Sequence, residues 1–201
     1  NVKAIDALGE DLLDDFSTLN SSIGMAVGPA GYGKSEAVKH FVIQHDQAAY
    51  VLYLEGFTVQ MLVKTIAKEL TGNCAATYEK NLNIIKDATC LSRKLVVIDE
   101  ADRMPIRYLE AVRGLNEYCG LPLLLIGEEG LIAKMDSQPR LKSRIRKPQI
   151  SFHPLNVTDV ATYYKQAVGL DISEDLGACT ILLKYAKRDF RNLVNDAQHI
   201  V

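Results

Sequence analysis

The sequence predicts an α/β fold, in which a parallel five-stranded sheet flanked by helices is followed by a small helical lid. Three observations lead to this prediction. Short continuous apolar runs alternate with segments of helical spacing, which is typical of parallel strands buried on both faces. The stretch 28–35 reads Gly-x-x-x-x-Gly-Lys-Ser between the first apolar run and a helix. No strand-like run remains after Pro154, so we expect a core over 1–153 and a lid over 154–201.

The composition limits the classes of function. With a net charge of −2 over 201 residues, binding to nucleic acid would need a local basic patch rather than overall charge. No apolar run is long enough to span a bilayer and no signal peptide is visible, which predicts a chain without membrane association. The cysteines are widely spaced with no C-x-x-C pair, which favours a reducing, cytoplasmic setting.

Helix and strand alternate in the first half of the chain. Apolar residues at helical spacing, among them Ile5, Leu12 and Phe16, predict a helix over 4–19. The segments predicted after it are a strand at 22–27, a helix from Ser35 to Gln44, a strand at 49–54 and a helix from Thr58 to Leu70. The strands are expected to run parallel, because helices connect them.

The second half continues this alternation and then becomes helical. The segments predicted in the core are a helix at 78–91, a strand at 95–98, a helix at 105–118, a strand at 122–126, short helices at 129–135 and 138–146, and a strand at 148–152. The lid is predicted as helices at 158–167, 173–186 and 189–201. Asn156 or Thr158 would cap the first lid helix, and Ser173 the second.

The stretch 28–35 has the composition of a phosphate-binding loop. Glycines let the backbone curl so that successive N–H groups point at phosphate oxygens, and the next helix adds the positive end of its dipole. Lys34 would reach the terminal phosphates of ATP, and the Ser35 hydroxyl would hold Mg²⁺. The residues expected to contact the nucleotide are Gly28, Pro29, Ala30, Gly31, Tyr32, Gly33, Lys34, Ser35 and Glu36.

Two carboxylates follow the strand at 95–98. In proteins with a phosphate loop, the acid at this strand end holds Mg²⁺, a role that falls to Asp99. Glu100 directly after it would polarise the attacking water, which favours hydrolysis over mere binding. The plainer alternative is that both acids cap the next helix. Asp102 completes the letters D-E-A-D, but the chain has one sheet-sized domain where such helicases need two, so we expect a helix-terminal acid.

The acidic strand lies far downstream of Lys34, with room for a further strand and two helices between them. The acidic strand is therefore not the next strand in the chain after the loop strand. This spacing favours a sheet in which another strand is inserted between the loop strand and the acidic strand.

With these motifs the chain resembles the AAA+ ATPases over nearly its whole length. The resemblance implies that Arg144 is an arginine finger reaching the nucleotide of a neighbouring subunit, and that Arg191 is a second sensor touching the terminal phosphate. Arg188 stands where this family usually has Gly, and 126–129 lacks the polar first sensor, which suggests slow hydrolysis. The alternative for both arginines is a solvated helix charge.

A finer resemblance is to transposition regulators of the Mu B and TnsC type, carried by Ile-Gly-Glu-Glu-Gly-Leu at 126–131, the basic helix at 139–145 and Arg-Asp-Phe-Arg-Asn-Leu at 188–193. It implies ATP-driven assembly into a filament or ring on double-stranded DNA, in the cytoplasm of a bacterium or phage-infected host. The assembly would select target DNA and stimulate a transposase. An ExeA-like secretion or cell-envelope ATPase and an initiator-type switch remain alternatives.

A DNA surface is suggested by the helix that follows the second strand. Lys64 and Lys68 would contact phosphates in the channel of the assembly, with Thr58 adding a neutral contact. The alternative is that this helix face is merely solvated. The basic cluster at 142–147 is a competing site. The chain has no Trp, so nothing favours stacking on single strands.

Overall fold

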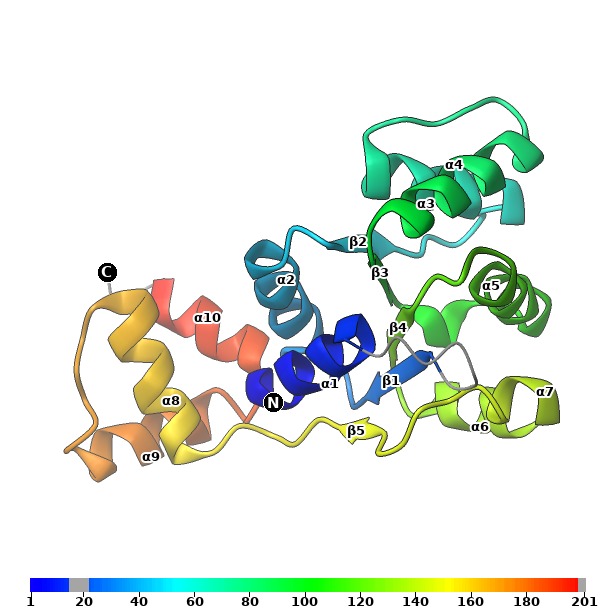
Figure 1. Ribbon diagram of the computed structural model, residues 1–201. Helices are drawn as coiled ribbons and strands as arrows, with labels where there is room; N and C mark the ends of the chain where they lie inside the picture. Colours follow the sequence, from blue (N-terminus) through cyan, green and yellow to red (C-terminus); the bar gives the residue numbers. More distant parts are fainter. Residues whose placement is uncertain (15–21, 199–201) are drawn as a thin grey trace. The chain divides into compact units, whose positions relative to one another are not determined.

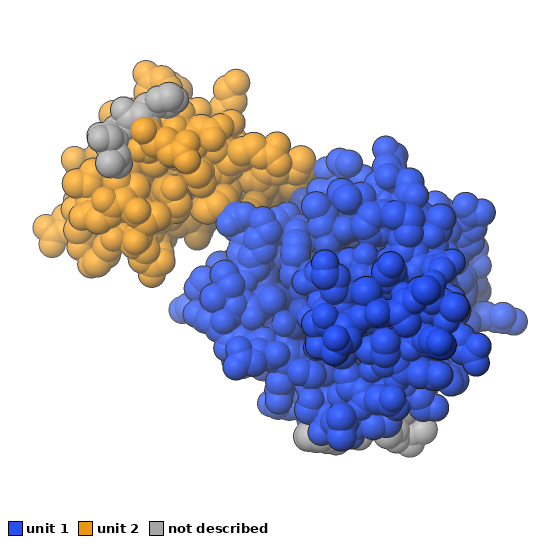
Figure 2. All heavy atoms as spheres, turned by 90° about the horizontal axis from the view of Figure 1, so that it is seen from above, with its two compact units in different colours: residues 1–27, 34–151 blue, residues 28–33, 152–201 orange. Residues whose placement is uncertain are grey.

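The computed structural model describes residues 1–14 and 22–198 of the chain. The chain divides into two compact units (Figure 2): a core unit of residues 1–27 and 34–151, and a lid unit of residues 28–33 and 152–201. Each unit has its own cluster of buried apolar side chains. Phe16 and the end of the last predicted helix lie outside the described residues. The predicted boundary after residue 153 stays a prediction.

The core unit is built on one sheet. Its described strands are β1 Ile23–Val27, β2 Ala48–Leu52, β3 Leu95–Asp99, β4 Leu123–Gly127 and β5 Ile150–Ser151. All neighbours are parallel and their order is β2-β3-β4-β1-β5, which confirms the predicted five-stranded parallel sheet. Because β4 pairs with both β1 and β3, it is the inserted strand that the spacing of the motifs predicts. β1, β3 and β4 are buried along their whole length, which explains their continuous apolar sequences.

Helices surround this sheet (Figure 1). In the core unit they are α1 Val2–Asp14, α2 Lys34–Gln44, α3 Val59–Thr71, α4 Tyr78–Leu91, α5 Ile106–Cys119, α6 Gly130–Asp136 and α7 Pro139–Lys142, with a 3-10 turn at Ala101–Arg103. The main apolar cluster joins alternate side chains of the central strands to α3, α4, α5 and α6. α1 and α2 pack against each other and contact the strands. The predicted helix at 138–146 is shorter than expected.

The connection between α3 and α4 is fixed by one buried amide. Asn81 is 0% exposed; its side chain accepts from the Ala75 N–H at 2.7 Å and donates to the carbonyl oxygens of Ala75 at 3.0 Å and Thr77 at 2.9 Å. Gln60 in the first turn of α3 donates to the Ala76 carbonyl at 2.9 Å, so the connection returns along α3. Thr58 and Thr77 cap the two helices by accepting backbone N–H groups.

The lid unit is helical after β5. It contains α8 Val157–Tyr163, a π-helical turn at Tyr164–Val168, α9 Leu176–Tyr185 and α10 Phe190–Gln198. Asn156 caps α8 in a capping box with Asp159, which confirms one predicted cap. The cap of α9 is Asp175 instead of Ser173, because the Ser173 hydroxyl donates to Asp171. Across the residues that the structure describes, no helix combines the length and apolarity needed to cross a membrane.

Candidate nucleotide-binding site

Two glycines of the predicted phosphate loop, residues 28–35, adopt left-handed backbone conformations. Gly31 has φ 80° and Gly33 has φ 78°, values at which a side chain would be strained. A Cβ on Gly31 would also overlap the carboxylate of Asp189 in the same unit. Both glycines are therefore required by the backbone path that the loop takes, which explains the spacing of the motif.

Within the lid unit, the start of α10 contacts this loop. The Phe190 N–H donates to the Gly31 carbonyl at 2.7 Å, and the Phe190 ring lies beside Gly33. Asp189 Oδ1 accepts the N–H of Arg191 at 2.8 Å and so caps the helix. The structure thus places Arg191, the predicted second sensor, on the first turn of the helix that contacts the loop, with its side chain exposed.

In the core unit, Lys34, Ser35 and Glu36 form the first turn of α2. Lys34 and Ser35 are half-buried, whereas Glu36 is exposed and pairs with Lys39 at 3.2 Å. The Ser35 hydroxyl and the Lys34 ammonium belong to a helix N-terminus, where the backbone dipole favours anions. Their contacts with a nucleotide stay predictions, as does that of Glu36.

Asp99 ends β3 and is 2% exposed. Both of its oxygens have donors: the Tyr50 hydroxyl on β2 donates to Oδ2 at 2.8 Å, and the Glu100 N–H donates to Oδ1 at 2.9 Å. Burial and this hydrogen bond to Asp99 raise the pKa of Tyr50, so the phenol stays protonated as a donor. The arrangement holds a buried carboxylate in one orientation, as a metal ligand requires.

Glu100 has a backbone conformation that residues other than glycine rarely adopt. Its φ is 60°, in the left-handed region, and such outliers are concentrated at functional sites. Its carboxylate pairs with Arg103 Nε at 2.8 Å, and its side chain is 37% exposed. To polarise a water, the carboxylate would exchange Arg103 for that water.

Arg144, the predicted finger, is in an ion-pair network of the core unit. Its Nη2 lies 2.9 Å from Glu117 Oε1, while Glu117 Oε2 pairs with Arg113 at 2.6 Å. Its carbonyl accepts the Ile23 N–H at 3.3 Å, which ties this segment to the start of β1. A finger role requires the guanidinium to leave Glu117, so the assignment stays a prediction.

A comparison with known protein families identifies the family to which this chain belongs. The sequence pattern of the family described as AAA domain matches residues 18–135, more than half of the chain. The chain belongs to the AAA family of ATPases. This confirms the AAA+ resemblance that the sequence motifs indicate.

Two relatives of this AAA chain match by sequence. The Mu-like prophage FluMu DNA transposition protein B of Haemophilus influenzae is 25% identical over 170 residues, covering 80% of this chain and 58% of that protein. A potential ATP-binding protein of Staphylococcus aureus is 30% identical over 104 residues, covering 48% of this chain and 38% of that protein. This chain therefore spans less than two thirds of either relative.

Solved structures share the fold. The ADP form of the Aeropyrum pernix ORC2 protein aligns with a TM-score of 0.68 at 18% identity, over 96% of this chain and 67% of that one. The Aeropyrum pernix ORC1 protein in complex with DNA aligns with a TM-score of 0.65 at 16% identity, over 96% and 56%. At these identities the likeness shows the AAA fold alone.

The end of β4, where the AAA+ resemblance implies a polar first sensor, holds Gly127. Asp102 Oδ1 accepts the Glu128 N–H at 3.0 Å, and a Cβ on Gly127 would lie 2.6 Å from that oxygen. Lys134 donates to the carbonyl oxygens of Asp102 and Met104. Asp102 is therefore an acid at the start of the 3-10 turn, as predicted, and it also bridges this turn to the end of β4. It leaves no room for a sensor side chain at Gly127.

The predicted DNA residues lie on α3 of the core unit. The Thr58 hydroxyl caps this helix by accepting the Met61 N–H at 3.1 Å. Lys64 and Lys68 are exposed one turn apart, and Met61, 48% exposed, lies on the same side by helical spacing. The structure brings these side chains to one surface, and their contact with DNA stays a prediction.

Proposed function

We propose that this chain binds Mg·ATP through residues 28–35, hydrolyses it, and uses this cycle to assemble on double-stranded DNA as a regulator of transposition. The observation that carries the nucleotide part is the glycine loop, whose left-handed Gly31 and Gly33 lead directly into the N-terminus of α2. The transposition part is supported by the name of the Haemophilus influenzae relative, a DNA transposition protein B. The DNA part is also supported by the DNA complex of an AAA neighbour in structure.

The side chains present fit a magnesium nucleotide. Mg²⁺ takes oxygen ligands and keeps several waters, so a carboxylate, a hydroxyl and phosphate oxygens suffice. Asp99 supplies a buried, oriented carboxylate, and Ser35 supplies a hydroxyl at a helix N-terminus. The bound ion would neutralise phosphate charge and orient the terminal phosphate. Glu100 would then polarise the attacking water.

Self-association would complete the site. In this proposal Arg191 touches the terminal phosphate of its own subunit, because α10 contacts the phosphate loop. Arg144 would exchange its pairing with Glu117 for the nucleotide of a neighbouring subunit. An arginine supplied in trans stabilises the charge of the transition state. ATP would thereby favour assembly, and hydrolysis would favour release.

Repeated weak contacts would hold the DNA. A subunit that contributes Thr58, Lys64 and Lys68 neutralises only a few phosphates, and a filament or ring multiplies these contacts. The affinity would then depend on assembly, and so on ATP. Target selection and stimulation of a transposase would follow from where the assembly forms.

The test is a fluorescence anisotropy titration of a labelled duplex with the chain, in ATP, ADP and no nucleotide, at two salt concentrations. We expect tight binding only with ATP, with an affinity that falls steeply as salt rises. Lys34→Ala should bind neither ATP nor DNA. Equal binding in all three nucleotide states would refute the proposal, and an absence of DNA binding would favour the secretion or cell-envelope alternative.

A further inference from the structure

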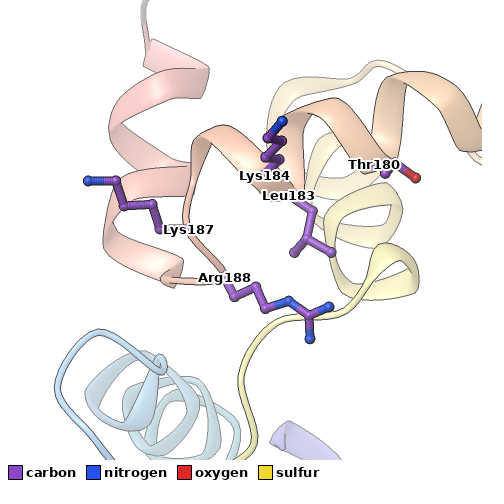
Figure 3. Close-up of a pocket in the computed structure, with 5 residues that line it drawn as sticks. All are labelled: Thr180, Leu183, Lys184, Lys187 and Arg188. Atoms are coloured by element: carbon purple, nitrogen blue, oxygen red, sulfur yellow. The ribbon is translucent and has the colours of Figure 1, made fainter.

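The end of α9 carries a hollow of about 390 Å³ in the lid unit (Figure 3). Its lining residues are Thr180, Leu183, Lys184, Lys187 and Arg188. Leu183 is buried in the lid core, whereas the other four are exposed. Three of the five lining side chains are cations and none is an acid, although the chain as a whole has a net charge of −2.

The cations of this hollow have no carboxylate partner among the described residues. Elsewhere on the lid, Lys165 pairs with Asp171 at 2.6 Å. Two acids close in sequence are engaged in helix caps: Asp175 accepts the Ala178 N–H, and Asp189 accepts the N–H groups at the start of α10. Lys184, Lys187 and Arg188 therefore present their full charge to solvent.

The helix end does not account for this much charge. The C-terminus of an α-helix carries a partial charge of about −0.5, which one nearby lysine is enough to offset. Lys184 already lies in the last turn of α9, and Lys187 and Arg188 follow the helix. Two cations of the hollow therefore remain after one has offset the helix dipole.

Two of the cations also occupy strained positions. Lys187 has φ 53° and Arg188 has φ 60°, in the left-handed region that glycine adopts without cost. The Arg188 N–H donates to the Leu183 carbonyl, and its own carbonyl accepts the Leu155 N–H, so the backbone path is fixed. Long basic side chains stand at two positions where glycine would be less strained, and such strained positions are concentrated at functional sites.

We infer that this hollow is a second contact surface for the phosphate backbone of double-stranded DNA. In Figure 3 the side chains of Lys184, Lys187 and Arg188 extend in different directions, so they do not enclose one small anion. Diverging cations suit a polyanion with regularly spaced charges, of which a DNA strand is the example. The inference rests on the proposed function and adds the lid to the DNA surface of α3.

The test compares the salt dependence of DNA binding in ATP. The logarithm of the binding constant falls with the logarithm of salt by about 0.9 per neutralised phosphate. The triple variant Lys184→Gln, Lys187→Gln and Arg188→Gln should lower this slope by about 2 to 3 and should weaken binding at least about tenfold. Lys165→Gln removes an ion-paired cation of the same unit and should leave the slope unchanged.

A second variant distinguishes the loss of a DNA contact from a loss of folding stability. Arg188→Gly removes the guanidinium and the backbone strain together, so the chain should unfold at the same temperature as the wild type or higher. The salt slope of DNA binding should nevertheless fall by about 1. Affinity for a fluorescent ATP analogue should match the wild type in every lid variant.

The outcomes are distinguishable from failure of the proposed function. A wild-type salt slope in the triple variant would refute the DNA contact of the lid. The proposed function would still stand if the double variant Lys64→Gln and Lys68→Gln weakens DNA binding. Absence of ATP-dependent DNA binding in the wild type overturns both. Lowered slopes in the triple variant and in Arg188→Gly, with Lys165→Gln unchanged, establish the contact.

Discussion

At the residue scale, the hydrogen bonds of Asp99 determine the orientation of the carboxylate at the end of β3. Asp99 is buried, and a buried carboxylate is tolerated only when donors satisfy its oxygens. Tyr50 is the donor from outside the acidic strand, across the β2–β3 pairing that aligns Leu52 with Asp99. We therefore interpret Tyr50 as a positioning residue, which acts on Mg²⁺ through Asp99.

Replacing Tyr50→Phe should raise the Mg²⁺ concentration that half-saturates binding of a fluorescent ATP analogue by about tenfold, because partners of metal ligands commonly contribute this much. Binding without Mg²⁺ should not change. Because the pKa of Tyr50 is raised, the phenol stays protonated, so its ionisation should contribute no change in the Mg²⁺ requirement between about pH 7 and 9.

The matched control is Tyr53→Phe, which removes a hydroxyl just after the same strand that makes no described hydrogen bond to the Asp99 carboxylate. The backbone N–H of Tyr53, which donates to the Asp99 carbonyl at 3.0 Å, is kept in this variant. Its Mg²⁺ requirement should equal that of the wild type. If Tyr50→Phe also has the Mg²⁺ requirement of the wild type, the hydroxyl of Tyr50 does not position Asp99 for metal binding.

The sequence alone could predict the residues of the phosphate loop and Asp99-Glu100, because each group is contiguous and has a fixed chemical pattern. It could not predict Tyr50 as a donor to Asp99, the pairing of Glu100 with Arg103, or the bridge from Asp102 to Glu128. The first and last of these depend on which strands and turns are neighbours. The second depends on the left-handed backbone of Glu100, which no motif specifies.

At the scale of elements, α3 keeps its place partly through the connection to α4. Asn81 satisfies three backbone groups of that connection from a fully buried position. The connection in turn accepts a hydrogen bond from Gln60 on α3. This support matters for function, because α3 carries the predicted DNA residues Lys64 and Lys68.

Asn81→Ala should lower the free energy of unfolding by about 2 kcal/mol, since buried backbone groups would lose their partners. The control is Asn83→Ala on the same helix, where the side chain is exposed and a change within about 0.5 kcal/mol is expected. Chemical denaturation followed by circular dichroism measures both. Equal midpoints for the two variants would contradict the anchoring role of Asn81.

Element types were largely predictable, and their ends were less so. Continuous apolar runs identified β1, β3 and β4, because central parallel strands are buried on both faces. The start of α9 was predicted at Ser173 and lies at Leu176, because Asp171 engages Ser173 and leaves the cap to Asp175. Several polar side chains near a helix start can act as its N-cap, and sequence spacing alone does not show which one does.

At the scale of the whole molecule, the predicted nucleotide-binding residues are distributed over both compact units. Residues 28–33 group with the lid helices, whereas Lys34, Ser35 and Asp99 belong to the core unit. The sequence order placed the loop in the core, because contiguity along the chain was the only guide. Its grouping with α10 follows from contacts such as Phe190 N–H to Gly31, which join distant parts of the chain.

The central claim is that ATP held at this site controls assembly on DNA. Sedimentation velocity of the wild type and of Glu100→Gln, each with a duplex and with ATP or ADP, tests it most directly. We predict large DNA-bound species with ATP only, which disappear in the wild type as ATP is consumed and persist in Glu100→Gln. Identical sedimentation in ATP and ADP, or equally short-lived species in both proteins, would contradict the claim.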